Sequence, residues 1–132
     1  MPTQAAINNK LANTIDSPVL SAFISFAVGT AALFLYILAA GIPLANLASA
    51  KNAPLIAWTG GLLGAFFVAA TVTSVPKLGV ALTFSLIIAG QMLITLVIDH
   101  FGLLGVPVKE VNLPRLLGVT LITIGVILIR RF

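Results

Sequence analysis

The chain has 132 residues, of which 60% are hydrophobic and only 8% are charged, whereas a water-soluble domain carries about 25% charged residues. Because so few polar residues cannot cover a globule in water, the composition predicts an integral membrane protein that has the lipid bilayer as its solvent. The net charge of +4 comes from basic residues scattered singly along the chain, which excludes the basic face of a nucleic-acid-binding protein, and the absence of cysteine excludes disulfides and thiolate metal sites.

The first predicted helix, at about 2–15, is too short and too polar to cross a bilayer by itself. A helix of this size is about 20 Å long, which suits a half-span or an interfacial segment. A break follows at Asp16 and Ser17. Either residue could cap the next helix, with Pro18 in the first turn of that helix.

Two long apolar segments follow, at about 18–40 and 54–73, and each is long enough to cross a hydrocarbon core of roughly 30 Å. The second segment contains Gly60 and Gly64, a spacing that allows another helix to pack closely. Trp58 lies near its start, where an indole ring favours the level of the lipid headgroups. We therefore interpret Trp58 as an interface anchor, with a stacking surface for a substrate as the alternative.

The predicted helix at about 78–102 carries a polar stripe, since Gln91, Thr95 and Asp99 recur at helical spacing in an otherwise apolar span. The amide of Gln91 can both donate and accept hydrogen bonds, which suits a substrate-facing residue, and the alternative role is hydrogen bonding between helices. Asp99 lies about 12 Å further along the helix, near one membrane face. It is interpreted as a solvated carboxylate at the helix end or, alternatively, as a proton or cation site.

The last predicted helix, at about 113–130, is close to the lower length limit for a membrane span. Gly118 and Gly125 lie a heptad apart in it and again suit close helix packing. No segment shows the alternation of an outer-membrane barrel strand. The predicted fold is therefore an all-α integral membrane protein with one domain over residues 1–132, built as a five-helix bundle with a short first helix and four full transmembrane spans.

The distribution of basic residues predicts an unusual orientation. One side of the membrane would receive Lys51, Lys109 and Arg115. The other side would receive Lys10, Lys77, Arg130 and Arg131. Because Lys and Arg accumulate on the cytoplasmic side, three residues against four give almost no bias. We therefore expect dual topology, in which two inverted copies pair as an antiparallel dimer. The alternative is a single topology, set by a partner or by a signal other than these charges.

Several runs of the sequence resemble one family. These runs are QAAINNKLA (4–12), SPVLSAFISFAVGT (17–30), GGLLGAFFV (60–68), PKLGVAL (76–82), AGQMLITLVIDHFG (89–102) and RLLGVTLITIGVILI (115–129). In this order they are similar to the YdcZ-like inner-membrane exporter family of the drug/metabolite transporter (DMT) superfamily. The resemblance implies a five-helix unit equivalent to half of a larger transporter, and pairing of two such units in antiparallel orientation.

The same resemblance places Gln4 and Asn8 in the first membrane helix, although a longer apolar stretch precedes the matching glutamine in the family. Gln4 and Asn8 share a helix face at a spacing of four residues and could line one cavity, with capping or interfacial solvation as the alternative. Together with Gln91, Thr95 and Trp58 they are the predicted substrate-binding residues.

Enzyme motifs such as HExxH, GxSxG or a P-loop are missing from the sequence, and no cofactor or metal is expected. We therefore expect a multi-pass protein of the bacterial inner membrane that exports a small polar or amphiphilic metabolite by alternating access. Its partners would be the lipid bilayer and either a second inverted copy or an inverted paralogue. The alternatives are a dual-topology ion channel and a structural membrane subunit without transport activity.

Overall fold

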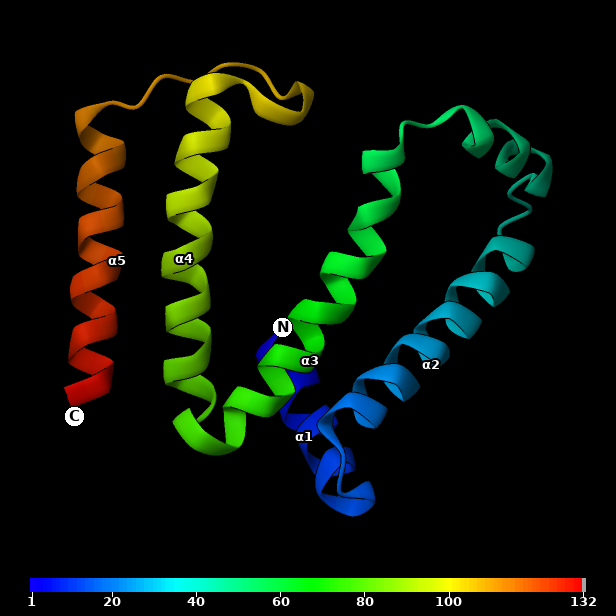
Figure 1. Cartoon of the computed structure of the whole chain (residues 1–132), viewed down its shortest axis with the longest axis horizontal. Coiled ribbons are helices and arrows are strands. Elements are labelled where there is room, and N and C mark those ends of the chain that lie inside the picture. Colours follow the sequence, from blue (N-terminus) through cyan, green and yellow to red (C-terminus); the bar gives the residue numbers. More distant parts are fainter. Residues whose placement is uncertain (132) are drawn as a thin grey trace. The chain divides into compact units, whose positions relative to one another are not determined.

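The computed structural model describes residues 1–131 and contains helices but no strands over that range (Figure 1). The α-helices are α1 (Pro2–Ile15), α2 (Pro18–Ala39), α3 (Thr59–Leu78), α4 (Val80–Phe101) and α5 (Leu113–Arg131). Three short 3₁₀ segments are η1 (Leu44–Asn52), η2 (Leu55–Trp58) and η3 (Leu103–Gly105). Four helical stretches are long and apolar enough to cross a membrane, so the all-α membrane class is confirmed.

The break between α1 and α2 uses both of the residues that the sequence offered. Asp16 ends α1 in the left-handed conformation with φ 51°, and its backbone N–H donates to the carbonyl of Ala12. Ser17 then caps α2, because its hydroxyl oxygen accepts a hydrogen bond from the backbone N–H of Leu20 at 3.3 Å. Pro18 occupies the first turn, where a missing N–H costs nothing.

The bounds of α3 differ from the predicted helix at 54–73. Residues before Thr59 form the 3₁₀ segment η2 after Pro54, and α3 then continues to Leu78 with Pro76 inside its last turns. The predicted end of this helix at residue 73 is therefore wrong. The helix stops at Gly79 instead, where φ is +77°, a conformation that glycine adopts without a Cβ clash.

The chain divides into two compact units, one built mainly from residues 3–77 and the other from residue 78 onward. The first unit holds α1, α2 and α3, and Figure 1 shows α1 as the short helix that precedes α2. Small residues of α1 and α2 are buried where these two helices contact each other, and Ser21 of α2 is fully buried there. The Ser21 hydroxyl donates to the backbone carbonyl of Asn8 at 2.6 Å and so joins the two helices.

The second unit is a hairpin in which α4 and α5 lie side by side and antiparallel (Figure 1). Gly102 ends α4 in the left-handed conformation with φ +59°, and η3 and an extended stretch lead to α5. Asn112 caps α5, since its side-chain oxygen accepts a hydrogen bond from the backbone N–H of Arg115 at 3.1 Å. Both ends of the connection are thus closed by local hydrogen bonding.

Most hydroxyls within the spans are satisfied inside their own helix. Eight Ser and Thr hydroxyls donate to the backbone carbonyl four residues earlier, at 2.7 to 2.9 Å. They belong to Thr30, Thr71, Thr73, Ser74, Thr83, Thr95, Thr120 and Thr123. Such back-bonding removes the need for a partner in lipid.

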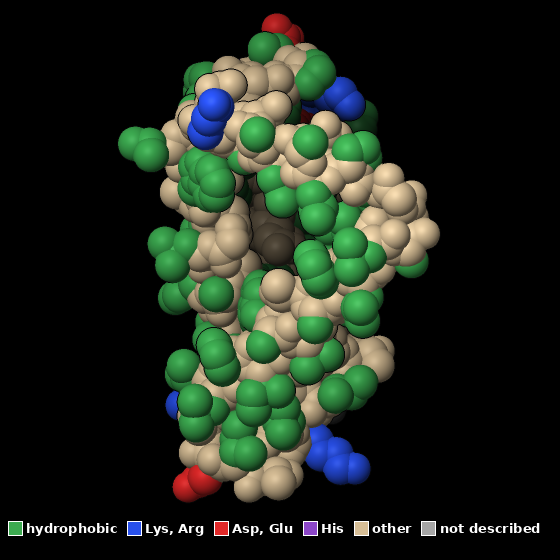
Figure 2. All heavy atoms as spheres, turned by 90° about the vertical axis from the view of Figure 1, so that its right-hand side faces the viewer, with side chains coloured by type: hydrophobic (Ala, Val, Ile, Leu, Met, Phe, Trp, Pro, Cys, Tyr) green, Lys and Arg blue, Asp and Glu red, His purple; other side chains and the backbone are tan. Residues whose placement is uncertain are grey.

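Large apolar side chains are exposed along all four spans, and at most 11% of an 18-residue apolar stretch of any span is buried within the chain. Figure 2 shows hydrophobic side chains distributed along the whole face that it draws, with Lys, Arg, Asp and Glu toward the upper and lower ends of that face. This arrangement suits an apolar solvent between two aqueous boundaries, which is the pattern of a protein that crosses a bilayer.

Candidate functional site

The α4–α5 hairpin encloses a cavity of about 240 Å³. Four residues of each helix line it, at spacings that place them on one face of α4 and one face of α5. The apolar part of its wall consists of Met92, Leu96, Val119 and Ile122. Gly118 opens the space, because a Cβ at this position would meet no other atom within 4 Å.

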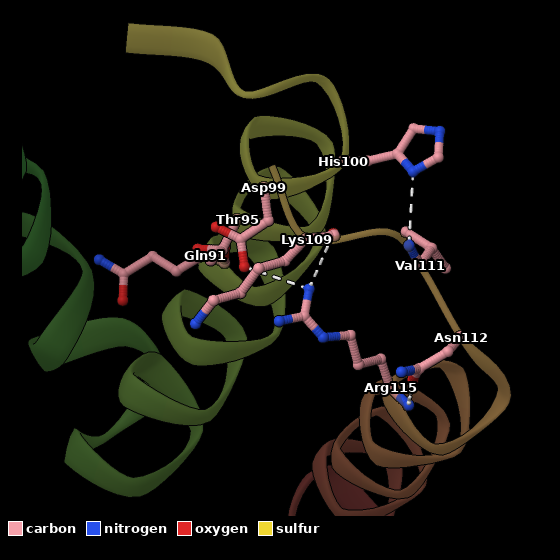
Figure 3. A network of polar contacts seen from close by, with 8 residues as sticks. All are labelled: Gln91, Thr95, Asp99, His100, Lys109, Val111, Asn112 and Arg115. Carbon is pink, nitrogen blue, oxygen red and sulfur yellow. Dashed lines mark hydrogen bonds and ion pairs between the residues drawn. The ribbon is translucent and has the colours of Figure 1, made fainter. Parts of the chain in front are cut away.

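An ion pair forms the polar end of this cavity. Arg115 Nη1 lies 3.2 Å from Asp99 Oδ2 and also donates to the backbone carbonyl of Lys109 at 3.2 Å (Figure 3). The side chains of Arg115 and Asp99 are 29% and 25% exposed, so both remain accessible at the cavity mouth. A partly exposed pair of this kind contributes only modestly to stability.

The loop between α4 and α5 is held against the end of α4. The backbone N–H of Lys109 donates to the carbonyl of Asp99 at 2.8 Å, and His100 Nδ1 accepts a hydrogen bond from the N–H of Val111 at 3.4 Å (Figure 3). These contacts bring the start of α5 to the end of α4. They therefore position Arg115 opposite Asp99.

The three residues of the predicted polar stripe on α4 do not lie in one site. Thr95 and Asp99 line the cavity, whereas Gln91 is exposed and its side chain extends away from α5 (Figure 3). Thr95 donates its hydroxyl to the backbone carbonyl of Gln91 at 2.8 Å, so it makes no side-chain contact with the Gln91 amide. The structure therefore groups Thr95 with the ion pair and leaves Gln91 on another face.

Arg115 is a site residue that sequence reasoning missed, since it entered only as a topology charge. The positions of the two charges in the sequence could have predicted their pairing. Asp99 ends one predicted span and Arg115 begins the next, so a short loop between two antiparallel helices puts both at the same membrane face. Opposite charges at that level are expected to pair.

Gln4 and Asn8 do not share an environment, although four residues separate them. Asn8 is 5% exposed and its Nδ2 has no hydrogen-bond partner, whereas Gln4 is exposed. Asn9 Oδ1 is likewise buried without a partner. A buried amide donor without an acceptor costs about 1–3 kcal/mol, so Asn8 marks a polar position that its own unit leaves unsatisfied.

The remaining predicted residues lie at helix ends or on open helix faces. Trp58 is the last residue of η2 and is exposed, directly before α3. A Cβ on Gly64 would lie 3.6 Å from the Phe26 ring of α2, so this glycine faces a neighbouring helix of its unit. Gly60 and Gly125 have open space around them within the chain.

A second cavity, of about 380 Å³, lies between α2 and α3 in the first unit. Its wall is almost entirely apolar and includes the rings of Phe23, Phe26 and Phe66. It offers contact area but no hydrogen-bonding group that could orient a polar ligand.

Within residues 1–131 no three His, Asp or Glu side chains come close enough together to hold a metal ion. The chemistry that the hairpin offers is binding. It combines one guanidinium and one carboxylate with an apolar wall, a combination that can orient an amphiphilic small molecule.

Comparison with known proteins gives a consistent result. The family model described as "Putative inner membrane exporter, YdcZ" matches residues 1–128. The curated protein "Inner membrane protein YdcZ" of Escherichia coli (strain K12) is 36% identical over 76 residues, which are 56% of this chain and 50% of that protein. The matched region thus spans about half the length of that relative. No solved structure matches the chain significantly.

Proposed function

This chain belongs to the YdcZ family and is a multi-pass protein of the bacterial inner membrane, and we propose that it is one subunit of a small exporter of polar or amphiphilic metabolites. The observation that carries the proposal is the environment of Gln91. This amide lies in the middle of α4 and is exposed, and it has no hydrogen-bond partner among residues 1–131, since Thr95 bonds to the backbone carbonyl of Gln91 and not to its side chain. A polar side chain at membrane depth is energetically costly, and a place on a substrate pathway is one way in which this cost is repaid.

We further propose that two such subunits pair in antiparallel orientation, because this pairing would explain the charge balance and the apolar helix faces that one chain leaves exposed. The near balance of three basic residues against four on the two sides supports insertion in both orientations. A second, inverted copy would cover apolar helix faces that one chain leaves open and would bring two Gln91 amides toward the midplane. A Cβ on Gly60 or Gly125 would meet no side chain or neighbouring helix within 4 Å, so both positions suit close contact with a helix of another subunit.

Alternating access follows from this assembly. Two inverted subunits can exchange conformations, so that the shared cavity opens first to one side and then to the other. Glycine contacts permit the small helix rotations that such exchange requires. The cargo would then bind near the bilayer midplane through amide hydrogen bonds rather than through a central charge.

Replacement of Gln91 tests the pathway. Bacteria that overproduce the wild-type chain are expected to accumulate at least one small polar or amphiphilic metabolite in the medium, measured by mass spectrometry. Gln91→Ala is expected to reduce this export by about tenfold, because a lost hydrogen bond in a desolvated site costs about 1.5 kcal/mol. Thr120→Val is the matched control, since Thr120 is exposed on α5 and bonds within its own helix.

The export measurement also separates the alternatives. Unchanged export by Gln91→Ala, at equal membrane levels of protein, would remove this residue from the mechanism. Equal medium composition with wild type and with empty vector would refute the exporter proposal as a whole. Rapid passive ion flux from loaded vesicles would point to the channel instead.

Charge substitutions test dual topology. The wild-type chain, fused at its C-terminus to green fluorescent protein or to alkaline phosphatase, is expected to give signal with both reporters, which report cytoplasmic and periplasmic ends respectively. Lys51→Gln should raise the cytoplasmic signal, because it leaves two basic residues against four on the side of the C-terminus. Lys77→Gln, the matched control near the other end of the same span, should shift the ratio in the opposite direction. One active reporter in all three proteins would contradict the antiparallel homodimer.

A further inference from the structure

We propose that the α4–α5 cavity is a binding site for a small zwitterion with an apolar side chain, of the size of one branched amino acid. This site does not include Gln91, and ligand binding to it can be measured without any transport assay. The proposal stands on three properties of the cavity, namely its paired charges, its apolar depth and its limited length.

Arg115 and Asp99 both keep hydrogen-bonding groups that their ion pair does not use. Arg115 uses Nη1 for Asp99 and for the carbonyl of Lys109, and its Nη2 and Nε have no partner among residues 1–131. Asp99 uses Oδ2, and its Oδ1 is likewise without a recorded partner in that range. A carboxylate can therefore bind the remaining guanidinium N–H groups while an ammonium group binds Asp99. A ligand that carries both charges leaves neither residue of the pair uncompensated.

The depth of the cavity is apolar. Leu96 and Met92 precede Asp99 along α4, and Val119 and Ile122 follow Arg115 along the antiparallel helix α5. A ligand bound by its charged end would therefore place an aliphatic side chain between the two helices. The opening left by Gly118 provides the space for it.

The length of the cavity favours a free small molecule over a lipid. From Asp99 to Met92 is about 10 Å along the helix, less than half of a hydrocarbon core of roughly 30 Å. The volume of about 240 Å³ lies below that of pockets for drug-sized ligands, which is about 300–1,000 Å³. A phosphatidylethanolamine headgroup has the same two charges, but its acyl chains would extend well beyond the apolar wall.

Three ligands of matched shape test the charge requirement on the purified full-length protein in dodecyl maltoside. They are L-leucine, 4-methylpentanoate, which lacks the ammonium group, and 3-methylbutylamine, which lacks the carboxylate. Isothermal titration calorimetry is expected to show that leucine binds about tenfold or more tightly than either single-charge analogue, because each analogue makes only one of the two charge-assisted contacts that leucine makes. Equal affinities for the three ligands, or no binding of leucine, would overturn the proposal.

Variants test the position of the site. Gly118→Leu fills the cavity and is expected to abolish leucine binding, whereas Thr120→Leu, at an exposed position of α5 outside the cavity wall, should leave it unchanged. Asp99→Asn should reverse the preference, so that 4-methylpentanoate binds more tightly than leucine, and a merely structural role of Asp99 would not produce this reversal. Leucine binding that survives in Gly118→Leu would refute the assignment.

A competition experiment distinguishes a free zwitterion from a lipid headgroup with the same two charges. If added phosphatidylethanolamine displaces leucine from the wild-type protein at low lipid-to-protein ratios, the site is a lipid headgroup site and the assignment to a free small molecule is wrong. If leucine binding is unaffected by the lipid, the assignment holds. A failure of export by the whole protein would leave this result unchanged, because the measurement depends on binding alone.

Discussion

Gly102→Ala is expected to destabilise the α4–α5 hairpin by about 2–5 kcal/mol, considerably more than the same change at Gly105. Both glycines have positive φ, +59° and +80°, so both variants suffer the strain of a left-handed residue with a Cβ, about 1–2 kcal/mol. A Cβ on Gly102 would also lie 2.7 Å from Val108 Cγ2 and 3.3 Å from the carbonyl of Val106. Val108 cannot easily turn away because its β-branched side chain is stiff, and such overpacking costs about 1–3 kcal/mol more.

Gly105 is the control because a Cβ there would meet nothing within 4 Å. The difference between the two variants therefore measures the contact of the loop with the end of α4. Thermal unfolding in detergent gives this difference, and the double variant Gly102→Ala, Val108→Ala should recover part of it. Equal melting temperatures for Gly102→Ala and Gly105→Ala would show that the loop does not pack against Gly102 in the way described.

Ser21→Leu is expected to detach α1 from α2. Ser21 is fully buried, and its hydroxyl donates to the carbonyl of Asn8 at 2.6 Å, so a larger side chain has no space at this crossing. The lost hydrogen bond contributes about 1 kcal/mol, and the overpacking adds about 1–3 kcal/mol. The sum is large for a helix as short as α1, which has 14 residues and is marginal without its packing.

Hydrogen–deuterium exchange provides a local measure of this effect. In Ser21→Leu the amides of α1 should exchange much faster than in the wild type, while those of α4 and α5 should be unchanged. Thr30→Leu is the matched control, since Thr30 is an exposed residue of α2 that bonds within its own helix. Unaltered protection of α1 in Ser21→Leu would mean that the crossing at Ser21 does not hold the helix.

Local patterns in the sequence predicted the helices well where hydropathy and capping act together. The apolar length of α2 and α4, and the cap at Ser17, are properties of neighbouring residues, and the structure has them. The bounds of α3 were predicted less well, because a proline reads as a helix stop, whereas Pro76 is accommodated in the last turns and glycine at 79 ends the helix.

The sites could be predicted only in part, because they depend on contacts between distant residues. Gln4 and Asn8 looked equivalent on a helical wheel, yet only Asn8 is buried, since burial depends on which face of α1 contacts its neighbours. Arg115 joins Asp99 because the loop between them folds back on the end of α4. The role of Gln91 and the antiparallel pairing involve groups outside this chain, so they remain predictions.

The back-bonded hydroxyls have a consequence for membrane insertion. A threonine such as Thr95 enters the bilayer with its hydroxyl already hydrogen-bonded to its own helix, so its transfer from water costs little more than that of valine. An amide such as that of Gln91 has no such local partner and carries its desolvation cost into the lipid. The polar residues of these spans therefore fall into two groups during biogenesis. The hydroxyls are neutral to insertion, whereas the amides destabilise the isolated chain and favour any assembly that supplies them with a partner.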